Sequence, residues 1–160
     1  MAVDKDTFRR VMGCFASGVT VVTLMDGEGC PLGLTATAFT SVSADPPLAL
    51  VCIGAESNTY EQFAVSESFA VNFLAADQAD LSQRFARSGG DKFAGLEWRP
   101  GELGVPILAG TIGYAECRIA HVYEGGDHSI FVGQIEAGGA SDGMPLTYFR
   151  GAYRSLTEGG

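Results

Sequence analysis

Apolar residues near the start of the chain recur at the spacing of one helix face. The stripe follows positions i, i+3, i+4 and i+7 and consists of Phe8, Val11, Met12 and Phe15. This spacing predicts a helix over residues 4–16 that packs the stripe on the core, with an aspartate as its N-cap. Packing is a sufficient reason for the stripe, so we assign it no chemistry.

Short runs of β-branched and apolar residues follow, and they predict strands. Residues 19–24 (VTVVTL) form the first run, and the turn residues at 26–29 (DGEG) predict a hairpin to a second strand over 31–37. Two prolines then precede an unbroken apolar run at 48–53. Such a run predicts a third strand that is covered on both faces.

Helical and extended patterns alternate through the middle of the chain. Ser57 is a candidate cap for a short helix over 58–65, and residues 69–74 predict another strand. Asp77 is a candidate cap for a second short helix over 78–87. Strands therefore outnumber helices in the predicted order.

The last part of the chain is predicted to be rich in hairpins. Residues 95–110 hold too many glycines and prolines for regular structure, so we expect them to wrap the surface. Two longer strands, 114–123 and 129–135, are joined by a tight turn in which Gly125-Gly126 supplies the positive φ. One closing strand is expected within 146–156.

About seven strands in hairpin order, with two or three short helices between them, indicate a mainly β protein. We predict an antiparallel barrel or sandwich and not a doubly wound parallel sheet. The chain has 160 residues, 46% hydrophobic and 18% charged, which is typical of an ordinary globular protein. We therefore treat residues 1–160 as a single domain.

The charge balance excludes several classes of partner. A formal net charge of −9 argues against nucleic acid and against an anionic membrane surface. No apolar run approaches the roughly 20 residues that span a bilayer. The first ten residues carry charges where a signal peptide would have its apolar segment, so we expect a cytoplasmic protein.

Cysteine, histidine and glycine patterns exclude further chemistry. The four cysteines form no CxxC pair and are expected to be reduced, and the two histidines are too few for a His-rich metal site, so we predict no metal. The chain has no dinucleotide-binding GxGxxG turn before a helix and no GxxxxGK[ST] phosphate loop. Its GxSxG string, GASDG at 139–143, lies in a predicted turn with no helix after it, so we do not interpret it as a nucleophile turn.

Small and hydroxylated residues gather between Gly33 and Tyr60. Hydroxyls before a buried strand, and again at 57–59 after it, suit a flat polar ligand that carries an anionic group. A polar surface loop between two strands is an equally open interpretation. Basic residues near this stretch in sequence order, at 84, 87 and 92, offer a local positive charge.

Seven motifs in a fixed order resemble those of a known family. They are FRRVMGCFASGVTVVT (8–23), GLTATAFTSVSADPPL (33–48), SNTY (57–60), FAVNFLAADQADLSQRFA (69–86), GDKF (90–93), GDHSIFVGQI (126–135) and PLTYFRGAY (145–153). The chain resembles the short-chain NAD(P)H:flavin oxidoreductases, the flavin reductase components of two-component flavin-dependent monooxygenases. The resemblance covers residues 6–154 and implies a Greek-key split β-barrel of the FMN-binding type.

The resemblance also implies cofactor-binding residues for FMN or FAD. Residues that match the flavin loop of the family are Thr35, Ala36, Thr37, Ser41, Val42 and Ser43. Thr37 stands where most members have asparagine, so we expect backbone contacts there. Residues that match contacts near the flavin phosphate or ring are Ser57, Thr59, Arg87, Lys92 and Phe93.

His128 is similar to the family's histidine that faces the nicotinamide side of the flavin. The resemblance implies that it orients NADH or NADPH, with Tyr148 and Arg150 nearby. A hydrogen-bonded histidine at a strand end is the alternative. His121 has no match in the family and is expected to be structural. Cys52 is read as a small buried residue, with a place near the flavin as the alternative.

Three functions remain open at this point. The first is a flavin reductase that transfers a hydride from NAD(P)H to FMN or FAD and supplies a partner monooxygenase. The second is an FMN-binding electron carrier of the same fold with little NAD(P)H turnover. The third is a module for another planar cofactor, such as pyridoxal phosphate or haem. The resemblance further implies a homodimer.

Overall fold

Strands dominate the structure, a computed structural model that describes residues 1–157. Within that range the helices are α1 (Lys5–Met12), α2 (Tyr60–Val65) and α3 (Ala79–Ala86). The strands are β1 (Ser17–Gly18), β2 (Thr20–Met25), β3 (Pro31–Ala36), β4 (Phe39–Ala44), β5 (Pro47–Gly54), β6 (Ser68–Phe73), β7 (Trp98–Pro100), β8 (Pro106–Leu108), β9 (Gly113–Gly125), β10 (His128–Ala140), β11 (Thr147–Phe149) and β12 (Ala152–Arg154). Over these residues, every helix is too short or too polar to cross a bilayer.

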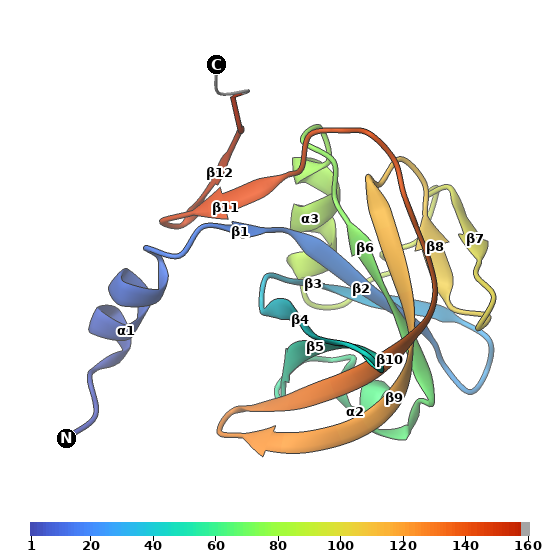
Figure 1. Cartoon of the computed structure of the whole chain (residues 1–160), viewed down its shortest axis with the longest axis horizontal. Helices are drawn as coiled ribbons and strands as arrows, with labels where there is room; N and C mark the ends of the chain where they lie inside the picture. The colour runs from blue at the N-terminus through green and yellow to red at the C-terminus, as the bar shows by residue number, and fades with distance from the viewer. Residues whose placement is uncertain (158–160) are drawn as a thin grey trace.

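Seven strands form one antiparallel sheet in the order β3-β2-β6-β9-β10-β5-β4. Its two edge strands are consecutive in the chain, since β3 ends at Ala36 and β4 begins at Phe39. At 3.8 Å between consecutive Cα atoms, these two residues lie at most about 11 Å apart. The sheet therefore rolls until its edges approach each other, and β3 also contacts β5. The rolled sheet in Figure 1 confirms the predicted antiparallel barrel.

Inward-facing side chains fill the rolled sheet. Val22, Val51, Phe69 and Phe131 are almost completely buried there. Helix α2 covers one end with Phe63, whose ring centroid lies 5.4 Å from that of Phe131 and 6.1 Å from that of Phe69. This aromatic cluster fixes the short helix beside the end of β5.

Strand β5 is buried on one face only, so the prediction that residues 48–53 are covered on both faces is wrong. Ala49, Val51 and Ile53 are buried, whereas the residues between them are half-buried. The half-buried face continues outward onto β4, which sequence patterns did not predict as a strand. The hydroxylated stretch at 39–44 is therefore an edge strand with a bulge between Ser41 and Ser43.

Residues 95–110 form two short paired strands, β7 and β8, and are not irregular as predicted. Asn72 on β6 is fully buried, and its amide donates to Val21 O (3.1 Å) and to Thr23 Oγ1 (3.0 Å). Its Oδ1 accepts from Leu108 N at 2.9 Å. The buried amide thus holds β8 against the sheet, because an unpaired polar group there would be costly.

A buried carboxylate holds the loop between β7 and β8. Glu116 on β9 is 1% exposed and accepts from Glu102 N at 3.0 Å and Leu103 N at 2.8 Å. Gly101 packs directly against this carboxylate, and a Cβ at this position would collide with it. Tertiary hydrogen bonds to β9, and not local propensity, therefore order this segment.

Helix α1 projects from the barrel together with the small sheet β1-β11-β12, and we call these four elements the arm (Figure 1). Asp4 caps α1 as predicted, accepting from Thr7 N at 2.7 Å. The helix buries no residue within the chain, and Phe8 and Phe15 are 57% and 75% exposed. The prediction that this stripe packs on the core of the same chain is wrong.

Other local predictions are wrong in detail. Neither Ser57 nor Asp77 is a helix N-cap. The N-cap residues of α2 and α3 are Thr59 and Gln78, and neither makes a side-chain cap hydrogen bond. The expected closing strand is split into β11 and β12, because Arg150 adopts a φ of 50° in the turn between them. In the β9–β10 hairpin only the second glycine of the predicted pair, Gly126, has a positive φ (78°).

Candidate functional site

Five of the predicted cofactor-binding residues line one cavity of about 190 Å³. We call it the cation cavity, and the five are Thr35, Ser57, Thr59, Arg87 and Lys92. They come from β3, from the loop before α2, and from the end of α3 with the loop that follows it. Helix α3 packs on β3, where Thr35 Oγ1 donates to Ser82 O at 2.6 Å. The fold therefore joins three stretches that are distant in the sequence.

Two hydroxyls form one wall of the cation cavity. Ser57 Oγ and Thr59 Oγ1 lie 2.9 Å apart, and Thr59 is 7% exposed. Since neither hydroxyl caps α2, both can turn toward a ligand without breaking the helix. Each hydroxyl can donate one hydrogen bond and accept two, which suits phosphate oxygens.

Two cations also line the cation cavity. Lys92 Nζ donates to Phe85 O at 3.0 Å and to Gly33 O at 3.4 Å. Burial lowers the pKa of the Lys92 ammonium, because the charged form loses water. Arg87 is exposed just after α3. Within residues 1–157, no carboxylate lies within 4.0 Å of either cation, so the cavity favours an anion although the chain carries a net charge of −9.

A larger groove of about 760 Å³ lies between the arm and the barrel, and we call it the arm groove. The predicted residues Thr37, Tyr148 and Arg150 line it. Arg150 places its guanidinium 5.1 Å from the Phe149 ring centroid, and its backbone N–H donates to Gly13 O at 3.1 Å. Other lining side chains are mainly apolar: Phe8, Met12, Phe15, Phe39, Leu50 and Cys52.

The cation cavity and the arm groove are neighbours along β3. Thr35 lines the first and Thr37 the second, and two residues of strand advance the chain by about 7 Å. A ligand with an anionic group and a flat apolar ring, joined by a short chain, fits this order. The residues present therefore suit a phosphorylated flavin, with its phosphate in the cavity and its ring in the groove.

Several predicted flavin residues line neither space. Ala36 is buried in the core, and its carbonyl accepts from Thr20 Oγ1 at 2.7 Å. The β4 residues Ser41, Val42 and Ser43 lie on the edge strand beyond the arm groove. Phe93 is 6% exposed and lies in an aromatic cluster with Phe85 and Trp98, beside the cation cavity.

His128 begins β10, opposite Gly54 at the end of β5. Its Nδ1 lies 2.7 Å from Asp127 Oδ1, and this hydrogen bond holds the pKa of the Asp127 carboxyl below its usual value. The imidazole lies over Gly54, where a Cβ would come within 3.5 Å of Nε2. His128 is therefore oriented, and only two residues separate its partner Gly54 from Ser57, but it lines neither the cation cavity nor the arm groove.

Sequence reasoning did not include some lining residues. Asn58 lies between the two predicted hydroxyls and lines the cation cavity, as do Glu56 and Ser88. Cys52 lines the arm groove half-buried, which matches its alternative place near the flavin, and burial raises the pKa of its thiol. Alternation along β5 was the available signal, because it turns Cys52 away from the core.

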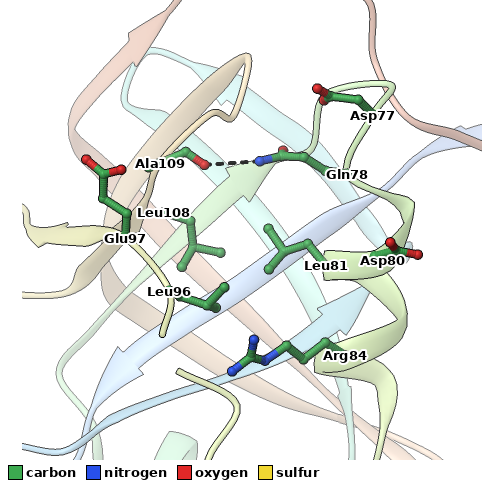
Figure 2. A pocket seen from close by; sticks show the side chains of 9 residues that line it. All are labelled: Asp77, Gln78, Asp80, Leu81, Arg84, Leu96, Glu97, Leu108 and Ala109. Atoms are coloured by element: carbon green, nitrogen blue, oxygen red, sulfur yellow. Dashed lines mark hydrogen bonds between the residues drawn. The ribbon is translucent and has the colours of Figure 1, made fainter. Parts of the chain in front are cut away.

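A separate cavity of about 380 Å³ lies between α3 and the segment before β8 (Figure 2). Leu81, Leu96 and Leu108 form its floor, and three carboxylates stand around it: Asp77, Asp80 and Glu97. Gln78 closes one side by donating to Ala109 O at 3.0 Å. It contains none of the predicted site residues, and its three carboxylates outnumber its one cation, Arg84, so it is unsuited to a phosphate.

The chain is similar to several curated proteins over almost its full length. It is 44% identical to the "Probable flavin reductase" of Rhizobium meliloti over 94% of this chain and 48% of the relative. It is 43% identical to the "Flavin reductase (NADH)" of Kitasatospora aureofaciens, over 94% of this chain and 81% of that protein. It is 39% identical to the reductase subunit HsaB of a flavin-dependent monooxygenase from Mycobacterium tuberculosis, over 96% and 83%. The chain thus spans about half of the first relative and about four fifths of the others.

Solved structures agree with this likeness. The Streptomyces globisporus NADH:FAD oxidoreductase SgcE6 superposes with a TM-score of 0.93 at 36% identity, covering 100% of this chain and 99% of that one. The same protein in complex with NAD and FAD fragments gives a TM-score of 0.92. The model of the flavin reductase like domain matches residues 12–157, which include the cation cavity and most of the arm groove. The chain belongs to the flavin reductase like domain family.

Proposed function

We propose that the chain is an NAD(P)H-dependent flavin reductase whose residues 1–160 act as one domain. A bound FMN or FAD accepts a hydride from the nicotinamide and carries two electrons onward. One observation supports this function most strongly: two hydroxyls and two cations from distant stretches meet in the cation cavity, directly beside an apolar groove. That arrangement is specific to a ligand with an anionic end and a flat ring.

The binding residues divide by the part of the flavin that they would hold. Lys92 and Arg87 neutralise the phosphate, and the hydroxyls of Ser57 and Thr59 donate to its oxygens. The backbone around Thr37 supports the ring at the start of the arm groove. The flavin-loop residues retained in the proposal through the family resemblance are Thr35, Ala36, Ser41, Val42 and Ser43, with Phe93 behind Lys92.

His128, Tyr148 and Arg150 are proposed to position the nicotinamide. Direct hydride transfer needs no general base, so the contribution of the protein is orientation. The hydrogen bond from His128 Nδ1 to Asp127 fixes the imidazole and leaves Nε2 for the ligand. Gly54 lets the imidazole lie close to the backbone of β5, because a Cβ there would come within 3.5 Å of Nε2.

The reduced flavin is proposed to serve a flavin-dependent monooxygenase. Support comes from relatives named as reductase components of such systems, in Mycobacterium tuberculosis and in Acinetobacter baylyi. We propose a cytoplasmic location, because all four cysteines are free thiols, as expected in a reducing compartment.

A homodimer is also part of the proposal. The arm exposes Phe8, Val11 and Met12 on α1, and Phe15 three residues after the helix ends. Contiguous apolar surface of this kind marks an interaction site in soluble proteins. A second copy that covers the arm would bury the stripe and would close the arm groove over the flavin ring.

Anaerobic stopped-flow absorbance tests the function directly. The protein with FMN or FAD is mixed with NADH or NADPH, and loss of the oxidised flavin absorbance is followed. Rapid, saturable bleaching is the expected result. A protein that binds flavin but leaves it oxidised with both nucleotides would instead be an electron carrier, and the reductase proposal would be rejected.

A further inference from the structure

The loop between β5 and α2 is tied at both of its ends to the hairpin that carries His128. At the start of the loop, Ala55 N donates to Asp127 O at 3.0 Å. Directly after the loop, Tyr60 Oη lies within hydrogen-bond distance of Ser129 Oγ, at 2.7 Å. Asp127 and Ser129 stand on either side of His128 in the sequence. Both anchors of the loop are therefore immediate neighbours of the histidine.

The second anchor is a hydrogen bond between two side chains. A backbone bond such as that of Ala55 can form with any residue except proline, whereas a tyrosine opposite a serine depends on both residue types. Ser129 is 6% exposed and Tyr60 is half-buried. The Tyr60 ring also packs edge-on against Phe131, with 6.4 Å between the ring centroids. A phenylalanine would pack in the same way, so packing alone does not account for the hydroxyl pair.

The same loop presents two hydroxyls to the cation cavity, those of Ser57 and Thr59. Tyr60 N donates to Ser57 O at 2.9 Å, which joins these hydroxyls to Tyr60 through the backbone. From Tyr60 the connection runs through its hydroxyl to Ser129. One peptide bond then leads from Ser129 to His128. A short series of hydrogen bonds thus links the cavity to the histidine.

An anion in the cavity would act on this series. Ser57 Oγ and Thr59 Oγ1 lie 2.9 Å apart, so one of the two hydroxyls donates to the other. Each hydroxyl has a single proton to donate, and a phosphate that accepts from both would replace that bond. The loop would then be fixed by the ligand. Since binding at a remote part of a substrate can be used to orient the reacting part, the position of His128 would respond.

We propose that the Tyr60–Ser129 hydrogen bond couples the phosphate site to His128, so that a bound flavin phosphate raises the rate of hydride transfer and not only the affinity for flavin. Tyr60 and Ser129 are positioning residues, because they act through His128. The inference rests on the proposed function, which places the phosphate at the loop hydroxyls and the nicotinamide at His128. The chemical step is unchanged, with one hydride and both of its electrons passing from NAD(P)H to the flavin.

Stopped-flow reduction of FMN and of riboflavin measures the coupling, with flavin and NADH both saturating. In the wild type we expect a rate constant for FMN about tenfold or more above that for riboflavin. Tyr60→Phe keeps the ring and removes the hydroxyl, so its rate constant for FMN should fall to that for riboflavin, while FMN binds no more weakly than before. Tyr123→Phe removes an exposed hydroxyl from β9 of the same hairpin and should preserve the wild-type ratio.

Amide hydrogen exchange gives a second measurement that needs no turnover. Without nucleotide, FMN should slow exchange over residues 127–132 of the wild type more than riboflavin does. In Tyr60→Phe, and separately in Ser129→Ala, the two flavins should slow this exchange equally. The double variant should behave like either single variant, because both substitutions remove the same hydrogen bond.

Equal rate constants for FMN and riboflavin in the wild type would overturn the inference and leave the reductase proposal intact. This comparison decides even if the variants do not fold. Weaker FMN binding in Tyr60→Phe with the wild-type rate ratio preserved would also overturn it, because the hydroxyl pair would then only hold the loop in place. If the wild type binds flavin but reduces neither FMN nor riboflavin, the proposed function itself fails.

Discussion

Lys92 is half-buried, and both of its observed hydrogen-bond partners are neutral carbonyls. Taking an ammonium partly out of water has a cost, which is the reason that the pKa of Lys92 is lowered. A phosphate beside Lys92 would offset that cost with a charge-assisted hydrogen bond. At the scale of single residues, Lys92 therefore has the environment most favourable for binding an anion.

Replacing Lys92 by alanine is expected to weaken FMN and FAD roughly tenfold to a hundredfold, because a hydrogen bond to a charged group contributes about 1.5–3 kcal/mol. Riboflavin, which has no phosphate, should bind almost as before. Fluorescence titration of the three flavins measures the effect. Lys5→Ala removes the other lysine of the chain, on exposed α1, and serves as the control. Equal weakening of all three flavins would exclude Lys92 from the phosphate site.

The same lysine predicts a pH dependence. Its pKa lies below 10.5, and the ammonium is charged only below that pKa. Affinity for FMN is therefore expected to be highest near neutral pH and to fall as pH rises through the lowered pKa. Riboflavin titrations at each pH correct for ionisation of the flavin ring. Lys92→Arg, which stays charged throughout, should keep its affinity; a parallel fall in that variant would contradict this explanation.

His128→Ala is expected to slow flavin reduction roughly tenfold to a hundredfold, since misplacing a reactant costs factors of this size. Flavin affinity should change little, because His128 does not line the cation cavity. Single-turnover bleaching with NADH separates the two effects. His121→Ala is the matched control, as His121 stacks on Tyr123 and belongs to no predicted site. Loss of flavin with normal turnover after its restoration would refute the positioning role.

At the scale of elements, α1 is the clearest case of a pattern with two physical solutions. The stripe of Phe8, Val11, Met12 and Phe15 predicts burial, but the helix spans only Lys5–Met12, not the predicted 4–16, and leaves Phe15 beyond its end. Periodicity identifies the apolar face of a helix, but it does not show whether the surface that covers this face belongs to the same chain. Here the helix lies away from the barrel, on the arm.

Phe15→Asp is therefore expected to separate the proposed dimer and not to unfold the chain. Aromatic residues at the centre of an interface contribute about 2 kcal/mol or more, which raises a dissociation constant roughly thirtyfold. Sedimentation velocity over a concentration series measures the shift, with circular dichroism as the test of folding. Val65→Asp places the same charge on α2, where the exposed valine is outside the arm. A wild-type monomer at high concentration would refute the dimer.

Much of the element order could be predicted from the sequence, because β-branched runs and glycine turns are local signals. Among the seven strands of six residues or more in the described range, five were predicted within two residues at both ends: β2, β3, β5, β6 and β9. Segments held by distant partners were not. Strands β7 and β8 depend on Asn72 and Glu116, which lie far away along the chain. Strand β4 was taken for a loop because its hydroxyls resemble turn residues.

The candidate site, too, could be predicted only in part from the sequence. Family motifs identified the hydroxyls and cations of the cation cavity, and the fold brings them together. No motif could show that Ala36 faces the core, or that Asn58 joins the cation cavity to a further one. Those facts depend on strand alternation and on how α3 packs against β3, both of which are tertiary.

At the scale of the whole molecule, the net charge of −9 opposes anionic ligands at long range. Salt screens this repulsion over about 8 Å at physiological ionic strength. Within that distance, Arg87 and Lys92 face the cation cavity without a carboxylate partner among residues 1–157. The acidic cavity of Figure 2 lies nearer the start of α3 and holds Arg84 beside its three carboxylates, while Glu56 is the one carboxylate among the residues that line the cation cavity.

The two residues between β3 and β4 join the opposite edges of the rolled sheet, and both line the arm groove. A flavin ring bound against Thr37 and Ala38 would lie on the segment that links the two edge strands covalently. Opening the barrel at that seam would then require the ligand to leave. When flavin is added, the amide hydrogens of β3 and β4 should therefore exchange more slowly, and by the same factor. The exchange rates of amide hydrogens in the arm should change independently of that factor.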